Sequence, residues 1–272
     1  MTVRQGFMLQ DADLTGVSVG EGFAFAAENG FDVVELNMEY GFEADRIDAG
    51  RVVDLAAKRD LDCLVHLPYR LDAGSPHRHV RDGSCRELEA ALDVAADVGA
   101  EKAVMHAGTM AHADAWDRET IVEANVASIR RVREYGADRG VEVVVENLKG
   151  PFVDVHDVPD LLSRTDATMC FDTGHAHVSG MGPAEQGSFL RDHGDRISHV
   201  HLNDTRRGDD DEHLPVGLGR LDFGPLADAM RETGWTGTCT HEVFGFDLGY
   251  VGLGKERFDR LLEDADPPAG VD

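Results

Sequence analysis

The chain has 272 residues, with 52 acidic against 26 basic side chains and a formal net charge of −26. Such a charge repels nucleic acid, but it is also typical of a halophile's surface, where dispersed carboxylates keep a protein in solution. We favour the halophile interpretation, because the acids are spread along the chain. High salt shortens the Debye length, so the net charge says little about the substrate.

The four cysteines form no CxxC motif, and three of them lie in apolar segments. Reduced thiols pack in such segments as small hydrophobic groups, which predicts a reducing, cytoplasmic location. The sequence has neither an apolar leader segment nor a run of about 18 apolar residues. We therefore expect neither a signal peptide nor a membrane span.

Short apolar segments alternate with amphipathic ones along the chain. The predicted strands are 4–9, 32–36, 62–67, 102–106, 142–146, 168–172, 197–202 and 238–243. The predicted helices are 85–98, 119–139, 158–163 and 226–233, with a glycine just after three of them. The strands show little polar alternation, as expected for parallel strands covered on both faces.

Eight strands in this arrangement predict a closed (β/α)8 TIM barrel that forms a single domain over residues 1–272. No GxGxxG motif follows the first strand, which weakens the alternative of an open dinucleotide-binding sheet. We expect the acidic, proline-containing tail 263–272 to be frayed.

Several apolar segments end abruptly in a side chain that can bind metal. In 169–177, MCFDTGHAH, Asp172 closes the strand and His175 follows a small-residue turn. Other strand ends carry Glu35, His66, His106, Glu146, His201 and Glu242, and the loop after the seventh strand carries Asp211 and His213. The carboxyl ends of barrel strands meet at one mouth, where divalent cations would stabilise such a ring of groups. The pattern therefore predicts a metal site.

Two histidines alternate within HVHLND. Residues two apart in a strand face the same side, so His199 and His201 both point into the barrel. His201 is nearer the carboxyl end and is the better candidate ligand. We expect His199 to be a core residue or to support a ligand.

The chain resembles the xylose isomerase-like barrel superfamily, which holds sugar phosphate isomerases and epimerases and the endonuclease IV group of apurinic endonucleases. The resemblance runs from FAAENGFDVVEL to THEVF. In the epimerase branch four ligands hold one divalent ion, and these match Glu146, Asp172, His201 and Glu242. In the endonuclease branch nine ligands hold three zinc ions, and the additional matches are His66, His106, His175, Asp211 and His213.

Other stretches divide between the two branches. ENGFDVVELNMEY and HEVF resemble the isomerases, and so do VENLKG and FDTGHAH. HLPYRLDAGSP resembles a DNA-facing loop, in which Tyr69 and Arg70 would contact a base or a phosphate. Arg206 and Arg207 follow HLNDT and could bind phosphate in either branch.

The leading hypothesis is an isomerase or epimerase of a small polyhydroxy carbonyl compound, with or without a phosphate group. The metal would stabilise an enediolate while Glu146 and Glu242 transfer the proton. His175 would orient a substrate hydroxyl and Arg206 would bind a phosphate. Glu35 has two interpretations, a group that hydrogen-bonds to the substrate and a carboxylate in a surface loop.

Two alternatives stay open. One is a trinuclear zinc phosphodiesterase that acts on abasic DNA, although nucleic acid is the weaker candidate partner. The other is a barrel that binds a metal or sugar for regulation, which would not need two proton-transfer carboxylates. Zinc, manganese and cobalt suit the mixed ligands about equally, at one to three ions per chain. The oligomeric state is also open, with a homo-oligomer as one option.

Overall fold

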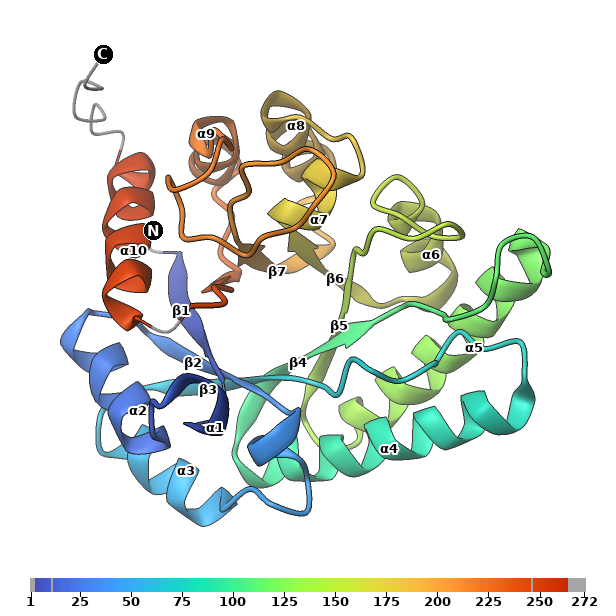
Figure 1. The fold of residues 1–272 in the computed structure, drawn as a ribbon, viewed down its shortest axis with the longest axis horizontal. Coiled ribbons are helices and arrows are strands. Elements are labelled where there is room, and N and C mark those ends of the chain that lie inside the picture. Colours follow the sequence, from blue (N-terminus) through green and yellow to red (C-terminus); the bar gives the residue numbers. More distant parts are fainter. Residues whose placement is uncertain (1–2, 11, 246, 264–272) are drawn as a thin grey trace.

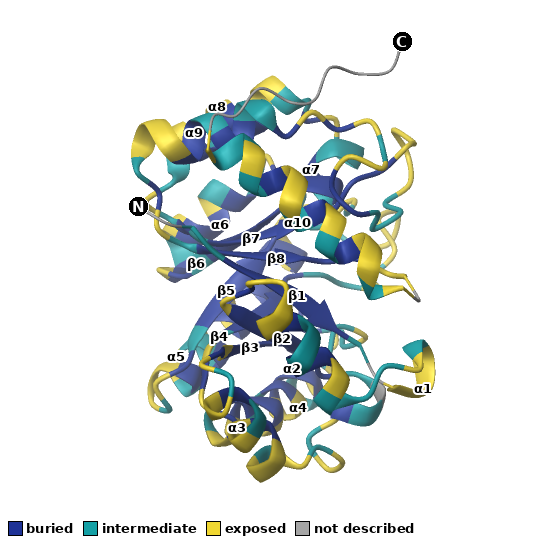
Figure 2. Ribbon diagram, turned by 90° about the vertical axis from the view of Figure 1, so that its left-hand side faces the viewer, coloured by how far each residue is buried: buried dark blue, intermediate teal, exposed yellow. Residues whose placement is uncertain are grey.

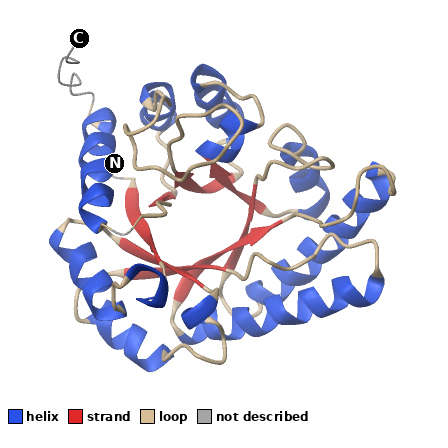
Figure 3. Ribbon diagram, in the orientation of Figure 1, coloured by secondary structure: helices blue, strands red, loops and turns tan. Residues whose placement is uncertain are grey.

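The computed structural model describes residues 3–10, 12–245 and 247–263. Over these residues, eight parallel strands follow one another around a closed barrel, and the last strand pairs with the first. The strands form a central ring with helices around it (Figures 1 and 3). The predicted (β/α)8 barrel is confirmed. Of the predicted frayed tail, 264–272 lies outside the described residues.

The strands lie close to their predicted positions. They are β1 (Arg4–Leu9), β2 (Val33–Asn37), β3 (Asp62–His66), β4 (Ala100–His106), β5 (Glu142–Glu146), β6 (Thr168–Asp172), β7 (Ile197–Leu202) and β8 (Thr238–His241). β1, β5, β6 and β7 have the predicted bounds. β8 ends earlier than predicted, so Glu242 lies just beyond the strand, where its N–H donates to the Leu202 carbonyl at 3.1 Å.

The helices cover the outside of the barrel. They are α1 (Ala12–Thr15), α2 (Val19–Glu28), the 3-10 helix η1 (Tyr40–Phe42), α3 (Ala49–Ala57), α4 (Arg78–Asp97), α5 (Arg118–Ala137), α6 (Val158–Thr165), α7 (Thr173–Val178), α8 (Pro183–His193), α9 (Gly224–Thr233) and α10 (Leu248–Leu262). Four of them, α4, α5, α6 and α9, correspond to the predicted helices. α4 begins at Arg78 rather than Cys85. The glycines that the sequence places just after α4 and α9, Gly99 and Gly234, have a left-handed φ of 72° and 67°.

Burial is as expected for a ring of strands surrounded by helices. The strands are buried, while the outer faces of the helices are exposed (Figure 2). In α2, Phe23 and Ala26 share the inner face, and Ser18 and Glu21 form a capping box at its start. Among the described residues, no helix combines the length and apolarity that a membrane crossing requires.

The inside of the barrel changes from apolar to polar along the strands. Val104, Val144 and Cys170 form a small buried cluster separate from the main core. Two residues further along each of these strands, the inward face carries His106, Glu146 and Asp172. The strand periodicity thus places ligand-type side chains one layer above an apolar floor.

Candidate metal centre at the barrel mouth

Four ligand-type side chains meet at the carboxyl end of the barrel. Glu146 and Asp172 end β5 and β6, His201 is the second-last residue of β7, and Glu242 follows β8. Each offers one ligand atom, and these atoms lie within 4.8 Å of one another. All four residues are buried. We call this group the central cluster.

Two further groups with the same spacing adjoin the central cluster. The first flanking cluster consists of His66, His106 and Glu146. The second flanking cluster consists of His175, Asp211 and His213. The three clusters together contain all nine residues that the sequence matched to a trinuclear site.

Glu146 belongs to two of these clusters, one through each oxygen. Its Oε2 lies 3.2 Å from Nε2 of His66 and 3.0 Å from Nε2 of His106. Its Oε1 lies 3.5 Å from Nδ1 of His201 and 3.9 Å from Nε2 of His175. A carboxylate placed in this way is suited to bridge two cations.

Buried polar atoms without a hydrogen-bond partner converge on the positions that cations would take. Nδ1 of His201, Nδ1 of His175 and Oδ2 of Asp211 are buried and have no hydrogen-bond partner among the described residues. The last two atoms lie 3.4 Å apart, and Nε2 of His213 lies 3.5 Å from the same oxygen. Buried polar atoms in native proteins nearly always have a partner. The residues therefore fit divalent metal ions, and mixed imidazole and carboxylate ligands suit zinc, manganese or cobalt.

Electrostatics of the central cluster also favours a cation. Burial and the charges of Asp211, Glu242 and Glu146 raise the pKa of Asp172 well above its ordinary value. Burial disfavours the ionised form of Glu242, but the neighbouring His201 lowers the pKa of that carboxyl to about 2. The neighbouring negative charges thus repel one another, and the protonated, neutral form of Asp172 is favoured. A divalent cation between them would remove this conflict.

Comparison with known proteins agrees with the barrel fold. Residues 23–265 match the sequence model of a family described as the xylose isomerase-like TIM barrel. The chain belongs to this family.

Relatives of this xylose isomerase-like barrel differ in their stated activities. It is 27% identical over 227 residues to an uncharacterized protein of Methanocaldococcus jannaschii, covering 79% of this chain and 76% of the relative. It is 27% identical over 235 residues to a probable endonuclease 4 of Mycobacterium leprae, covering 82% and 90%. A crystal structure of a D-tagatose 3-epimerase-like protein superposes with a TM-score of 0.82 at 24% identity, covering 97% and 98%, which shows the shared fold.

Two asparagines that sequence reasoning missed hold Asp172 in place. Asn147 accepts from the Asp172 N–H at 2.8 Å and donates to its carbonyl at 3.0 Å. Asn203 donates to the Asp172 carboxylate at 2.5 Å. A Cβ at Gly174 would overlap the Asn203 side chain and approach Asp211 closely, which explains the glycine of FDTGHAH. Asn147 directly follows Glu146 in VEN and Asn203 stands two residues after His201 in HLN, and this closeness to candidate ligands is the signal that could have identified them.

The loop after β7 is tied to the barrel by Asp204, which was also missed. This buried carboxylate accepts hydrogen bonds from four backbone N–H groups, those of Thr205, Gly217, Gly219 and Leu221. It thereby holds both ends of the segment that carries Asp211 and His213. His213 has a φ of 47°, which is uncommon for a residue other than glycine, and it stacks on Phe244 with 4.0 Å between the ring centroids. The loop therefore presents its two candidate ligands in a fixed conformation.

Glu35 lies deeper in this xylose isomerase-like barrel than the sequence suggested. It is fully buried, and its two oxygens lie 3.1 Å from Nε2 of His199 and 3.1 Å from Nε2 of His201. The interpretation as a surface-loop carboxylate is wrong, because β2 continues to Asn37 and leaves Glu35 facing the barrel interior. The two histidines occupy the oxygens that a substrate would need.

Tyr69 and Arg70 lie beside the first flanking cluster. The Tyr69 ring centroid is 5.7 Å from that of His66 and 5.6 Å from that of His106. The Arg70 guanidinium lies 5.3 Å from the centre of the Tyr69 ring. These contacts place both residues at the rim of the centre, where a role in substrate binding stays a prediction.

Arg206 and Arg207 are engaged with carboxylates. Nε of Arg206 donates to Glu212 at 3.1 Å, and Nη1 of Arg207 lies 3.3 Å from Asp210. A phosphate that bound either arginine would have to compete with these partners.

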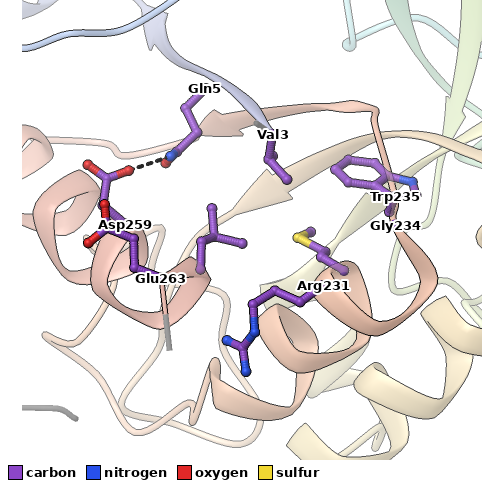
Figure 4. Close-up of a pocket in the computed structure, with 9 residues that line it drawn as sticks. Val3, Gln5, Arg231, Gly234, Trp235, Asp259 and Glu263 are labelled. Carbon is purple, nitrogen blue, oxygen red and sulfur yellow. Dashed lines mark hydrogen bonds between the residues drawn. The ribbon is translucent and has the colours of Figure 1, made fainter. Parts of the chain in front are cut away.

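A separate cavity lies at the other end of the strands, between β1, α9 and α10. Its volume is about 370 Å³, and its lining includes Val3, Trp235 and Arg231. Gln5 donates to Asp259 across one side of it at 2.6 Å (Figure 4). Its lining residues belong to none of the three clusters, so we assign it no part in the metal centre.

Proposed function

We propose that this protein is a divalent-metal-dependent isomerase or epimerase that acts on a small polyhydroxy carbonyl compound, with or without a phosphate group. The placement of Glu146 and Glu242 around His201 carries the proposal. Their carboxylates approach Nδ1 of His201 to 3.5 and 3.1 Å, and they come from β5 and from the end of β8, with β6 and β7 between. Two carboxylates thus flank one candidate cation position, as a proton transfer between two sides of a substrate requires.

Each residue of the centre has a role in this reaction. A divalent ion in the central cluster would polarise the substrate carbonyl and acidify the neighbouring C–H. One of the two glutamates removes that proton, and the other supplies a proton to the opposite side. His175 has a side chain that is 20% exposed, and it lies close enough to Glu146 to orient a substrate hydroxyl.

The charge of the mouth supports a small substrate over nucleic acid. The loop 38–48 carries four carboxylates and one arginine, and that arginine, Arg46, pairs with Glu43 at 3.2 Å. DNA binding depends on cations that neutralise phosphates, and this loop adds more negative than positive charge to the mouth. Concentrated salt would weaken this discrimination. The charge therefore supports the proposal, while the carboxylate geometry carries it.

The second candidate is hydrolysis of a phosphodiester at an abasic site in DNA. It is favoured by Glu146, whose two oxygens serve two clusters and would hold two cations close together. Cations at that spacing can stabilise both the attacking and the leaving oxygen of a phosphate ester. The similarity to the probable endonuclease 4 of Mycobacterium leprae points the same way.

We also propose a cytoplasmic location in a salt-adapted cell. The four cysteines are free and buried, which suits a reducing compartment. The dispersed carboxylates suit high intracellular salt.

Hydrogen exchange at carbon distinguishes the two reactions. Ketoses, aldoses and their phosphates would be incubated in heavy water with the protein, zinc, manganese or cobalt, and concentrated potassium chloride. We expect deuterium to enter one substrate at the carbon next to the carbonyl, as seen by proton NMR, and metal-stripped protein to give no exchange. An abasic oligonucleotide is tested in parallel. Incision of that oligonucleotide with no exchange in any sugar would overturn the proposal in favour of the second candidate.

A further inference from the structure

A line of buried hydrogen bonds connects the lower part of the barrel to the central cluster. Nζ of Lys102 donates to the Thr238 hydroxyl at 2.9 Å, and that hydroxyl lies 2.7 Å from Nδ1 of His199. Nε2 of His199 lies 3.1 Å from one oxygen of Glu35, and Nε2 of His201 lies 3.1 Å from the other. Lys102 is the third residue of β4, so the line runs from near the start of one strand to the end of another.

The direction of the hydrogen bonds can be followed upward from Lys102, at the lower end of the line. A lysine ammonium only donates, and Nζ of Lys102 is held by the Ser198 carbonyl at 2.9 Å as well as by Thr238. The Thr238 oxygen therefore accepts from Lys102, and among the described residues Nδ1 of His199 is the acceptor within reach of its hydrogen. A His199 that accepts this hydrogen carries its own hydrogen on Nε2, from which it donates to Glu35.

Glu35, at the upper end of this line, independently places the hydrogen of His199 on Nε2. An ionised carboxylate only accepts, so Glu35 requires a hydrogen on Nε2 of both histidines. When His201 is neutral and carries its hydrogen on Nε2, it has a lone pair on Nδ1. That atom lies 3.1 Å from Glu242 and has no hydrogen-bond partner among the described residues.

We propose that Glu35, His199, Thr238 and Lys102 form a positioning chain that fixes His201 in the tautomer whose Nδ1 can bind a metal ion. Glu35 and His199 are fully buried and Thr238 is 2% exposed, so water does not compete for these hydrogen bonds. The chain acts on the metal through His201 alone. The inference rests on the central cluster as a metal site, which both candidate functions share.

If these four side chains only filled the barrel interior, replacements of the same shape would leave metal binding unchanged. Glu35→Gln keeps the shape but presents an NH2 group to one of the two histidines. That histidine must then move its hydrogen from Nε2 to Nδ1 or lose its hydrogen bond. Where the histidine is His201, the hydrogen occupies the atom that faces the metal site.

The test uses two measurements on the full chain in concentrated potassium chloride. Nitrogen-15 NMR of labelled histidines, in metal-free protein at a pH high enough for the rings to be neutral, reports the tautomer of each ring. Titration with zinc against a competing chelator reports affinity. In the wild type we expect His199 and His201 to carry their hydrogens on Nε2. In Glu35→Gln we expect a second tautomer at one of them and zinc binding weaker by about 10- to 100-fold.

A second pair of variants keeps the proposal testable where Glu35→Gln fails to fold. Thr238→Val removes one hydroxyl from the chain, and we expect zinc binding weaker by about 3- to 10-fold, with Thr238→Ser restoring it. Thr240→Val is the matched control, because Thr240 lies on the same strand, is equally buried and stands nearer Glu242. Its hydroxyl has no hydrogen-bond partner in the described part of the chain, so we expect no change.

Three outcomes would overturn the positioning chain. They are a neutral His201 with its hydrogen on Nδ1 in the wild type, unchanged zinc affinity in both Glu35→Gln and Thr238→Val, and an equal effect of Thr238→Val and Thr240→Val. Absence of isomerase activity would not count against the positioning chain, because neither the tautomers nor the zinc affinity depends on which substrate reacts.

Discussion

Oε2 of Glu146 lies 3.0 Å from Nε2 of His106, so the carboxylate that serves the central cluster also serves the first flanking cluster. The two residues end the neighbouring strands β5 and β4 and face each other in the register of the sheet. The distance between the two clusters is therefore set by the barrel itself and not by a mobile loop. The second flanking cluster differs, because Asp211 and His213 come from the loop after β7.

Replacing Glu146 by glutamine should lower the metal content of the two clusters that share it. The amide keeps the shape but has one neutral acceptor oxygen in place of two charged ones. We expect zinc affinity there to fall by at least about 100-fold, more than for a residue that only supports a ligand. Metal analysis after dialysis measures the loss, and circular dichroism should show an intact fold. His177→Ala is the control, and an unchanged metal content in Glu146→Gln would remove Glu146 from the ligands.

Replacing Asp211 by asparagine separates the two candidate functions. An isomerase needs the ion of the central cluster, so we expect Asp211→Asn to retain that ion and to raise KM about 10-fold, because the loop loses a charged contact at the mouth. His213→Ala should behave alike. Asp210→Asn is the matched control, since Asp210 is exposed and pairs with Arg207. Asp211 and His213 belong to one of three clusters, so loss of about a third or more of the native zinc in either variant would instead support the trinuclear phosphodiesterase.

Most of the fold, and the convergence of the candidate ligands at strand ends, could be predicted because both depend on strand periodicity. An apolar run that ends in Asp172 or Glu146 predicts a strand and a mouth-facing carboxylate together. Helices α2, α8 and α10 were not predicted, because glycines in VGEGFAFAAE, PAEQGSFLRDH and LGYVGLGKERFDRLL lower helix propensity and interrupt the apolar pattern. These helices form because their apolar faces pack on the barrel. Such packing cannot be read from the local sequence of each segment.

Partners from distant strands could not be predicted. Glu35 and His199 are 164 residues apart in sequence, and their contact exists only because the barrel closes. The same holds for Asn203, which reaches Asp172 from the next strand. Sequence periodicity shows which way a side chain points, but a buried polar partner is known only when the register across the whole barrel is known.

The Cys63 thiol should make stability fall at alkaline pH. Burial raises the pKa of Cys63 from 9.0 to about 12. A raised pKa means that the thiol ionises at lower pH in the unfolded chain than in the folded protein. The stability that the protonated thiol contributes is therefore fully present below about pH 9 and is lost as pH rises toward about pH 12. Urea unfolding near pH 8 and near pH 10 measures this slope. Cys63→Val removes the ionisable group and should show a smaller loss, and an identical loss in both proteins would contradict the prediction.

Replacing Glu242 by glutamine tests the two-carboxylate mechanism directly. Proton transfer at carbon needs a base on the side of the substrate where the hydrogen leaves, and glutamine cannot accept that proton. If Glu242 and Glu146 serve opposite sides, Glu242→Gln should stop deuterium uptake for one substrate epimer and leave single-turnover exchange for the other. Because Glu242 is also in the central cluster, the metal content of the variant is measured first and exchange is compared at full loading. Asp247→Asn, which alters an exposed carboxylate beyond the same strand, should exchange like the wild type. Equal slowing of both epimers at full metal loading would show that the two glutamates do not divide the proton transfer.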